Sequence, residues 1–329
     1  EGRFYSAQDA DSLDEHGHSE EGAFFVWTPE RVRAILSKED AEIFERYYGV
    51  TPTGNFENGY TVLSVKGTVP PSAEAKEKCF NVRSTRSRPG LDDKSLCSWN
   101  ALMISALAWA SRLDLDGLES KARETALTVF DFITEQMSPS GKLQSVYARG
   151  RARFPAYLDD YSFAAMAALD LGKTEQAKQW IKECLDRFED SEAGGFFFTS
   201  SDHEKLIARP KTAYDQAIPS GTSVTIEVLT VLSVLLDNGS THEEKADWHL
   251  YKLLSLLERS TFGMAELANA ALLHLIGPIT ITNSQPASPF VFLKQDSGTK
   301  TLFCHGKTCT EVTNAVDLRA KILEKTRLQ

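Results

Sequence analysis

The chain has 329 residues, of which 42% are hydrophobic and 25% charged, with a net charge of −10 and five cysteines. This composition is typical of a folded globular protein with a sizeable core, and it argues against disorder. The basic residues are outnumbered and scattered, which argues against a nucleic-acid partner. Five dispersed cysteines do not make a disulfide scaffold, so a reducing, cytoplasmic location is expected.

The first ninety residues predict short elements joined by loops. Residues 1–28 read as a β-hairpin, with FYSAQDADS and AFFVW on either side of a polar turn. Helices are predicted over 30–36, 37–48 and 73–86. The chain opens without Met and within strand-like text, so we expect a fragment that lacks its first helices.

Residues 91–112, LDDKSLCSWNALMISALAWASR, carry no charged side chain between Ser95 and Ser111. A helix that is apolar nearly all round must be surrounded by protein, so we expect a buried inner helix here. The run is too short and too rich in Ser and Asn to cross a bilayer, and no membrane partner is expected. Acidic residues at its start suggest a polar pocket at the mouth of the helix.

The rest of the chain alternates between apolar inner helices and amphipathic outer helices. We expect the inner helix 95–111 to pair with 117–137, 161–171 with 174–189 and 222–236 with 242–258, and 264–276 to begin another pair. One pair cannot bury its apolar face without neighbours, so the pattern predicts a mostly α fold, an (α/α)6 toroid incomplete at its N-terminus. Residues 1–277 are assigned to this barrel domain. Residues 278–329 are assigned to a small appendage with strands near 290–293 and 300–304 and a helix over 316–327.

Polar residues gather just before the inner helices, where the loops of such a ring meet on one face. Paired carboxyl groups in a pocket can act as general acid and base, as sugar hydrolysis requires. The catalytic candidates are Asp92, Asp93, Asp159 and Asp160. The alternative is that each pair only caps its helix.

A second set of side chains could bind a substrate at the same face. Aromatic rings could stack on sugars, Lys and Arg could bind hydroxyl or anionic groups, and the Asp215 loop adds further polar residues. The substrate-binding candidates are Tyr5, Asp9, Asp11, Lys94, Trp99, Asn100, Tyr161, Arg209, Lys211 and Ser220.

Histidines and cysteines give weaker signals. His16 and His18 fit a solvated turn, His274 fits a core position, and His203 is the histidine nearest the expected pocket. Cys304 and Cys309 have a C-x4-C spacing that allows a disulfide, half of a metal site or free thiols. No metal and no cofactor are predicted.

Several longer motifs resemble one family: FYSAQDADS, FFVWTPE, RPGLDDKSLCSWNALMISALA, LDDYSFA, GGFFFT, IPSGTS and CHGKTC. Together they resemble the C-terminal barrel of the thioredoxin-fused YyaL-like family, which includes spermatogenesis-associated mammalian members. The resemblance implies a barrel similar to N-acylglucosamine 2-epimerases and six-hairpin glycosidases, and a thioredoxin-like domain in the full-length chain. Sugar epimerases of this fold use a pair of pocket histidines, which we do not find at matching positions.

The sequence therefore leads to three hypotheses. The first is a carbohydrate-active barrel that uses carboxylate acid/base chemistry on a sugar or glycoside. The second is a non-catalytic barrel that binds a ligand or protein for the attached thioredoxin-like domain, and the third is a sugar epimerase or isomerase.

Overall fold

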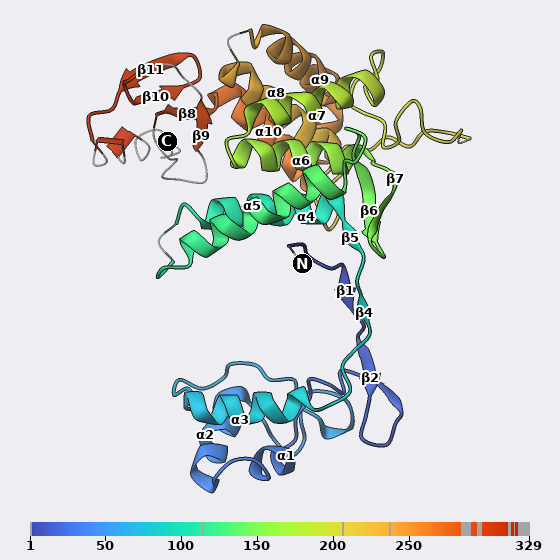
Figure 1. Cartoon of the computed structure of the whole chain (residues 1–329), viewed down its shortest axis with the longest axis vertical. Helices are drawn as coiled ribbons and strands as arrows, with labels where there is room; N and C mark the ends of the chain where they lie inside the picture. The colour runs from blue at the N-terminus through green and yellow to red at the C-terminus, as the bar shows by residue number, and fades with distance from the viewer. Residues whose placement is uncertain are drawn as a thin grey trace. The chain divides into compact units, whose positions relative to one another are not determined.

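The computed structural model describes residues 2–113, 115–205, 207–236, 238–283, 291–294, 298–314, 317–318 and 320–321. As predicted, the fold is mostly helical, with small sheets (Figure 1). The chain forms two compact units. Residues 1–4 with 94–329 make the helical unit, and Tyr5–Asp93 make the inserted unit.

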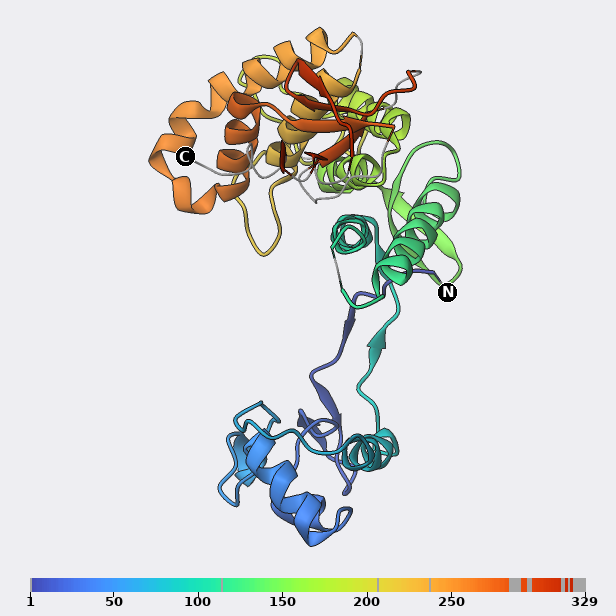
Figure 2. The same ribbon diagram turned by 90° about the vertical axis from the view of Figure 1, so that its left-hand side faces the viewer.

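The inserted unit contains two pairs of short strands. Strand β1 (Ala7–Gln8) pairs antiparallel with β4 (Leu91–Asp92), and β2 (Asp11–Leu13) pairs with β3 (Ser19–Glu21) (Figure 2). The predicted hairpin over 1–28 is therefore shorter than expected. Gly22 has a φ of 71° and turns the chain directly after β3, so AFFVW continues as turns instead of a strand.

Its helices are α1 (Pro29–Arg33), α2 (Lys38–Tyr48) and α3 (Ala73–Ser84), with a 3-10 turn η1 (Glu57–Gly59). Helix α2 is capped at both ends: Ser37 Oγ accepts from the Asp40 N–H at 3.2 Å, and Gly49, with a φ of 70°, ends the helix. These helices bury a core of their own, built from Trp27, Val32, Leu36, Ala41, Phe44, Val50, Ala75 and Cys79.

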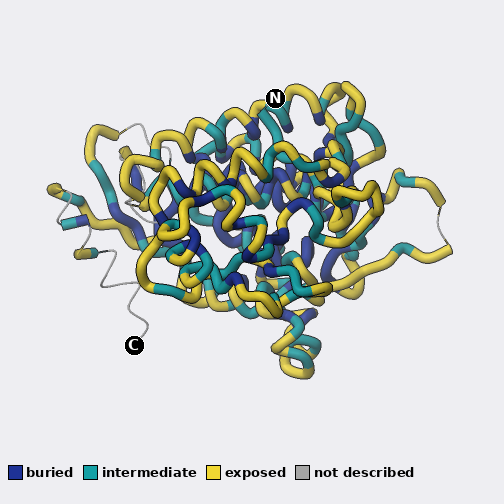
Figure 3. The backbone as a smooth tube through the Cα atoms, turned by 90° about the horizontal axis from the view of Figure 1, so that it is seen from below, coloured by how far each residue is buried: buried dark blue, intermediate teal, exposed yellow. Residues whose placement is uncertain are grey.

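The helical unit is built from consecutive helix pairs. The inner helices are α4 (Cys97–Ala110), α6 (Leu158–Asp170), α8 (Gly221–Leu235) and α10 (Ala265–Ile276). The outer helices are α5 (Glu119–Gln136), α7 (Thr174–Arg187) and α9 (Ser240–Arg259), and a 3-10 turn η2 (Thr261–Gly263) precedes α10. Each outer helix packs on the inner helix before it, and successive inner helices pack on one another (Figure 1). The helices alternate between buried and exposed residues along the chain (Figure 3).

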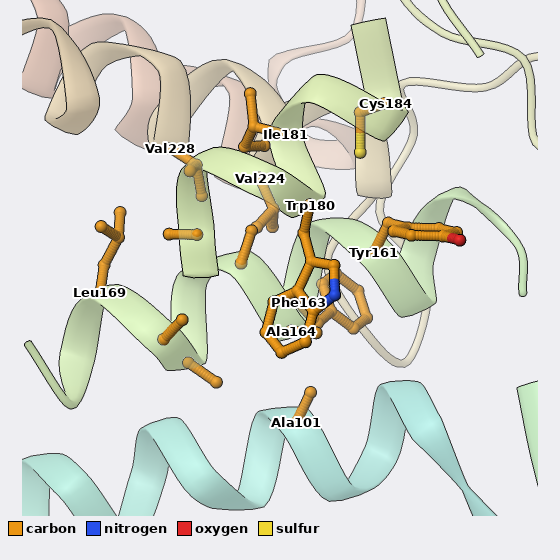
Figure 4. Packing of buried hydrophobic residues seen from close by; sticks show 14 of the residues in the cluster. Ala101, Tyr161, Phe163, Ala164, Leu169, Trp180, Ile181, Cys184, Val224 and Val228 are labelled. Atoms are coloured by element: carbon orange, nitrogen blue, oxygen red, sulfur yellow. The ribbon is translucent and has the colours of Figure 1, made fainter. Parts of the chain in front are cut away.

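The core of this unit lies between the inner helices and their outer partners. Phe163 of α6 and Trp180 of α7 lie together, and Ala101 of α4 faces them (Figure 4). Val224 and Val228 extend the same core from α8. Small residues on α4 and α6 let these helices approach closely.

Two boundaries of the inner helices differ from the prediction. Helix α4 begins at Cys97 instead of Ser95, because Ser95–Leu96 form strand β5, which pairs with β6 (Gln144–Ala148). Strand β6 in turn pairs with β7 (Arg151–Pro155), a hairpin that the sequence did not predict. Helix α6 begins at Leu158, so Asp159 and Asp160 lie inside its first turn instead of before it.

Helix α4 is also less enclosed than expected. Trp99, Met103 and Trp109 are 47%, 39% and 40% exposed among the described residues. Its buried side is formed by Cys97, Asn100, Ala101, Ile104 and Ala108. Because apolar residues occur on every face of this helix, the sequence did not show which face is buried and which is exposed to solvent.

The C-terminal residues form a four-stranded sheet with the strand order β11-β10-β8-β9. Its strands are β8 (Ile279–Thr282), β9 (Val291–Lys294), β10 (Leu302–His305) and β11 (Thr308–Glu311). It has a small core of its own, and β9 and β10 fall close to the predicted strands. The helix predicted over 316–327 lies mainly outside the described residues.

The division into units differs from the predicted domains. Residues 5–93 were assigned to the barrel, yet they surround a separate core. The C-terminal sheet was assigned to an appendage, yet it clusters with the helical unit, where β9 contacts α6. Within the described residues, no helix is both long and apolar enough to cross a bilayer.

Candidate functional site

The helical unit has a cavity of about 240 Å³ at the N-terminal ends of α6 and α8. The helix starts contribute carboxyl, hydroxyl and backbone groups, and the preceding loops contribute aromatic rings and an amide. Its lining residues are Leu158, Asp159, Phe196, Phe198, Thr212, Tyr214, Gln216, Ile218, Pro219, Ser220 and Gly221. This lining includes the predicted candidates Asp159 and Ser220 and, among the described residues, contains no Lys, Arg or His.

Asp159 is the ionisable acid of this cavity. Its Oδ1 accepts a hydrogen bond from the Gly221 N–H at 3.1 Å, which joins the first turn of α6 to the start of α8. Burial raises the pKa of Asp159 to about 6, and the Gly221 hydrogen bond offsets part of that rise. Asp159 is therefore partly protonated near pH 6 and can donate a proton.

Gly221 makes this close approach possible. A Cβ atom at that position would lie 2.3 Å from Asp159 Oδ1 and 3.0 Å from Leu158 Cγ. Any side chain would therefore push α8 away from α6 or displace the carboxyl group. The IPSGTS segment thus requires glycine for packing between two inner helices.

Asp160 has a different environment. It is 2% exposed, and its two oxygens accept from the backbone N–H groups of Tyr157 and Ser98, both at 2.9 Å. Burial raises its pKa to about 6, and the hydrogen bonds act against that rise. These contacts fit the capping alternative, because Asp160 caps its own helix and also the first turn of α4.

Asp215 makes the third contact of this kind. Its Oδ1 accepts from the Ser220 N–H at 2.9 Å, and its Oδ2 accepts from the Glu266 N–H at 2.8 Å. Carboxyl groups therefore join the starts of successive inner helices, from α4 to α6, α8 and α10. The sequence placed Asp215 among the polar loop residues but did not predict this contact.

Glu227 of α8 and Glu266 of α10 form a carboxyl pair that was not predicted as a site. Burial, together with the hydrogen bond and the charge of Glu266, raises the pKa of Glu227 well above its ordinary value. The pair can share a proton between two inner helices. The available signal was that Glu227 is the charged residue of an otherwise uncharged inner helix.

Three other candidates of the helical unit have defined positions. Trp99 is 47% exposed, so its ring is available to a ligand. Asn100 is 1% exposed and exchanges hydrogen bonds with the Phe4 backbone at 2.9 and 3.1 Å. Tyr161 is 0% exposed, and its hydroxyl accepts from the Leu143 N–H at 3.1 Å, so its ring faces the core and cannot stack on a sugar.

The predicted cationic anchors already have partners within the protein. Arg209 donates to the Thr199 carbonyl at 3.2 Å and lies over the Phe197 ring, 4.1 Å from its centroid. Lys211 donates to Asp190 Oδ2 at 2.6 Å. Both hold the loop that leads to α8, which suggests a structural role. Lys94 is exposed at the start of the helical unit's second segment.

The remaining candidates belong to the inserted unit. Tyr5, Asp9, Asp11 and Asp93 are exposed, and Asp9 Oδ1 accepts from the Asp11 N–H at 3.2 Å. Asp92 lies in strand β4, paired with Ala7. Asp92 and Asp93 therefore lie in a different unit from Asp159, and their role as its acid/base partners stays a prediction.

The inserted unit has a larger cavity, of about 620 Å³, that the sequence did not predict. Residues of the β2–β3 hairpin, α1 and the end of α3 line it. Its arginines are engaged, because Arg31 pairs with Glu15 at 3.3 Å and Arg86 donates to the Val26 carbonyl at 2.8 Å. None of the predicted site residues lines this cavity.

The histidines have mainly structural contacts. His274 lies between Thr230 Oγ1, at 3.1 Å, and Asp247 Oδ1, at 2.7 Å. His203 lies near the Tyr157 ring, and His16 and His18 are exposed in the β2–β3 turn. His249, which the sequence did not single out, is 0% exposed and accepts from the Gly195 N–H at 3.0 Å.

The sulfur chemistry is that of a disulfide. Cys304 and Cys309 are bonded to each other, which selects the first of the three alternatives for their spacing. Across the described residues, no group of three or more His, Cys, Asp or Glu side chains could hold a metal ion.

Comparisons with known proteins identify relatives without a defined activity in their names. No protein-family model matches the chain. Human "Spermatogenesis-associated protein 20" is 30% identical over 277 residues, which cover 68% of this chain and 35% of the relative. The rat protein of the same name is 29% identical over the same shares. A Caenorhabditis elegans protein named "Uncharacterized protein B0495.5" is 29% identical over 294 residues, 75% of this chain and 40% of the relative.

The chain thus spans between about a third and two fifths of the length of these curated relatives. The identity is spread over most of this chain, which supports the relationship that the sequence motifs indicated. The chain is therefore similar to the proteins named spermatogenesis-associated protein 20.

Proposed function

We propose that the helical unit binds a sugar or glycoside in the cavity at the starts of α6 and α8, and that Asp159 acts there as a proton donor. The observation that carries this proposal is a carboxyl group with a pKa of about 6 that lines a cavity with aromatic rings. A general acid works best when its pKa lies near the working pH.

The lining of the cavity favours a neutral or amine-bearing ligand. Phe198 and Tyr214 offer ring faces to the C–H groups of a sugar, and Gln216 and Ser220 offer hydrogen-bonding groups to its hydroxyls. Of the residues that the structure describes, no Lys, Arg or His lines the cavity to neutralise a carboxylate or phosphate of a ligand. Asp215 is not one of the lining residues, and its two oxygens accept the N–H groups of Ser220 and Glu266.

The proposed architecture is a six-hairpin (α/α) toroid, of which this chain contributes the hairpins from α4 onward. Support comes from the packing order of the inner helices and from the outer helices on α4, α6 and α8. The proposal includes a thioredoxin-like domain as partner in the full-length chain, as the sequence resemblance implies. The epimerase alternative has less support, because the described part of the chain places no histidine in the lining of the cavity.

The second candidate is a non-catalytic binding unit, and one observation favours it. Asp159, Asp160 and Asp215 each accept backbone N–H groups at the start of a neighbouring inner helix. Helix capping alone would therefore account for their presence.

The test uses Asp159→Asn and a panel of neutral, amino and uronic sugars, with calorimetry for binding and product analysis for turnover. We expect a neutral or amino sugar to bind both proteins and to be converted at least about 100-fold more slowly by the variant. The exposed Asp186→Asn, on α7, should match the parent. Turnover that is unchanged in Asp159→Asn would exclude the acid role. Binding without turnover by the parent would favour the binding unit.

A further inference from the structure

The disulfide of the C-terminal sheet joins two sulfurs in different environments. Cys304 of β10 and Cys309 of β11 are direct neighbours in the antiparallel register. Cys304 is 2% exposed. Cys309 is exposed, as is every residue of β11. Cys309 is therefore more accessible than Cys304 to a thiolate arriving from solvent.

The other cysteines do not compete for such a reaction. Cys79, Cys97 and Cys184 are free and buried, with exposures of 3%, 0% and 0%. Burial raises the pKa of each of these thiols, which keeps them neutral and unreactive. All five cysteines of the chain lie within the described residues, and Cys309 is the exposed one.

The disulfide adds little to the stability of the sheet. The two cysteines are five residues apart in sequence, and their strands are already hydrogen-bonded in the sheet. The stabilisation that a disulfide gives grows with the length of the loop that it closes, so a bond across this short loop stabilises the fold only slightly. A purely structural reason for the bond is therefore weak.

The surroundings leave space for a reacting partner. A cavity of about 370 Å³ is lined by both cysteines and by residues between α8 and α9. Lys307, in the turn between the cysteines, is held by the Glu243 carboxylate at 2.8 Å.

We propose that Cys304 and Cys309 form a reversible dithiol–disulfide exchange site, whose partner is an external dithiol. One partner thiolate attacks Cys309 Sγ, the bond between the two cysteines breaks, and Cys304 leaves with the electron pair and takes up a proton. The second partner thiolate then attacks its own sulfur in the mixed disulfide and releases Cys309, which is protonated in turn. The partner is oxidised to a disulfide, and this chain gains two electrons and two protons.

The asymmetry also explains why a dithiol is required. Cys304 lies directly opposite Cys309, so its thiol can attack a mixed disulfide at Cys309 and expel a partner that has a single thiol. A partner with two thiols can complete the reduction before that return step. The same arrangement makes Cys309 the reactive thiol and Cys304 the resolving thiol on reoxidation.

The first experiment reduces the intact native chain with dithiothreitol, blocks free thiols with N-ethylmaleimide and locates the label by mass spectrometry. We expect Cys309 to be labelled at a rate within about tenfold of that in the urea-unfolded chain. When 2-mercaptoethanol replaces dithiothreitol at an equal thiol concentration, we expect far less labelling by N-ethylmaleimide. Reduction only after unfolding would overturn the proposal, and equal reduction by the monothiol would overturn the dithiol requirement.

The second experiment compares Cys304→Ser with Cys309→Ser, which both lose the same bond. With 2,2′-dithiodipyridine, we expect Cys309 in the first variant to react at least about tenfold faster than Cys304 in the second. Circular dichroism of both variants checks that each is folded. Equal rates, or a faster reaction at Cys304, would overturn the assignment of the attacked sulfur.

Discussion

Three aspartates of α6 hold their protons unusually tightly. Burial raises the pKa values of Asp159, Asp160 and Asp170 to about 6, from an ordinary value of 3.8. Between these two pH values, the folded chain binds more protons than the unfolded chain. The contribution of these groups to stability is therefore complete below about pH 4 and is lost as the pH rises through about 6.

Asp170→Asn should remove one of these contributions. The Trp109 Nε1–H donates to Asp170 Oδ1 at 2.7 Å, and the amide oxygen of Asn can accept the same bond. We expect the unfolding free energy of the variant, relative to the parent, to rise by up to about 3 kcal/mol between pH 4 and pH 7. Urea unfolding at four pH values measures this difference.

The control for this prediction is Asp186→Asn, an exposed position on α7. Its stability difference from the parent should stay flat over the same range. A flat difference for Asp170→Asn would mean that this carboxyl group titrates in the folded chain as it does in the unfolded one.

The sequence predicted which polar residues stand at the inner helix starts but not what they contact. Asp159 and Asp160 are adjacent residues of the same type, yet Asp159 lines a cavity and Asp160 is buried. The difference arises from the direction in which each side chain leaves the first turn of α6. Only the packing of α4 and α8 on that helix decides which backbone N–H group each carboxyl meets.

At the scale of the helices, the contact between α6 and α8 depends on Gly221. Gly221→Ala would raise helix propensity by up to about 1 kcal/mol, since Ala is the better helix former. The new Cβ, at 2.3 Å from Asp159 Oδ1, should more than cancel that gain. We expect a net loss of roughly 1–3 kcal/mol in unfolding free energy, measured by urea denaturation.

Gly90→Ala is the matched control, because its Cβ would meet nothing closer than 3.8 Å. That variant should lie within about 0.5 kcal/mol of the parent. A Gly221→Ala protein as stable as the parent would show that α6 and α8 can separate at no cost.

Helix positions were predicted well where caps and periodicity agreed. Helix α2 begins after Ser37 and ends at Gly49, as expected, because a side-chain cap and a left-handed glycine mark its ends. Helix α4 was predicted to start two residues too early, at Ser95, because Ser95 and Leu96 form a strand instead. Strand pairing between distant residues leaves no periodic signal in so short a segment.

At the scale of the molecule, the two units have separate cores. Phe44 and Phe163 are buried to similar extents, 2% and 1% exposed, one in each unit. Phe44→Ala should lower the stability of the inserted unit by roughly 3–5 kcal/mol, and Phe163→Ala should do the same for the helical unit. Calorimetry of the intact chain should then show each variant moving a different transition. A common shift in both variants would mean that the units unfold together.

The existence of the inserted unit could not be predicted from the helical pattern. Its residues are no more polar than the loops of a barrel, and its entry at Tyr5 and exit at Asp93 lie far apart in sequence. The pairing of Ala7 with Asp92 brings these ends together. That contact depends on backbone hydrogen bonds, which many sequences can form.

The carboxyl contacts between the helix starts also bear on how the helical unit assembles. They join residues that are 62, 62 and 51 positions apart, about one helix pair each. Each can form only after the intervening pair has docked in its correct register. A pair that docks one turn out of place leaves a carboxyl group and an N–H group without partners, at a cost of about 1–3 kcal/mol for each buried group. These aspartates thus disfavour misfolded arrangements of the helix pairs, because a misdocked arrangement is less stable than the correct one.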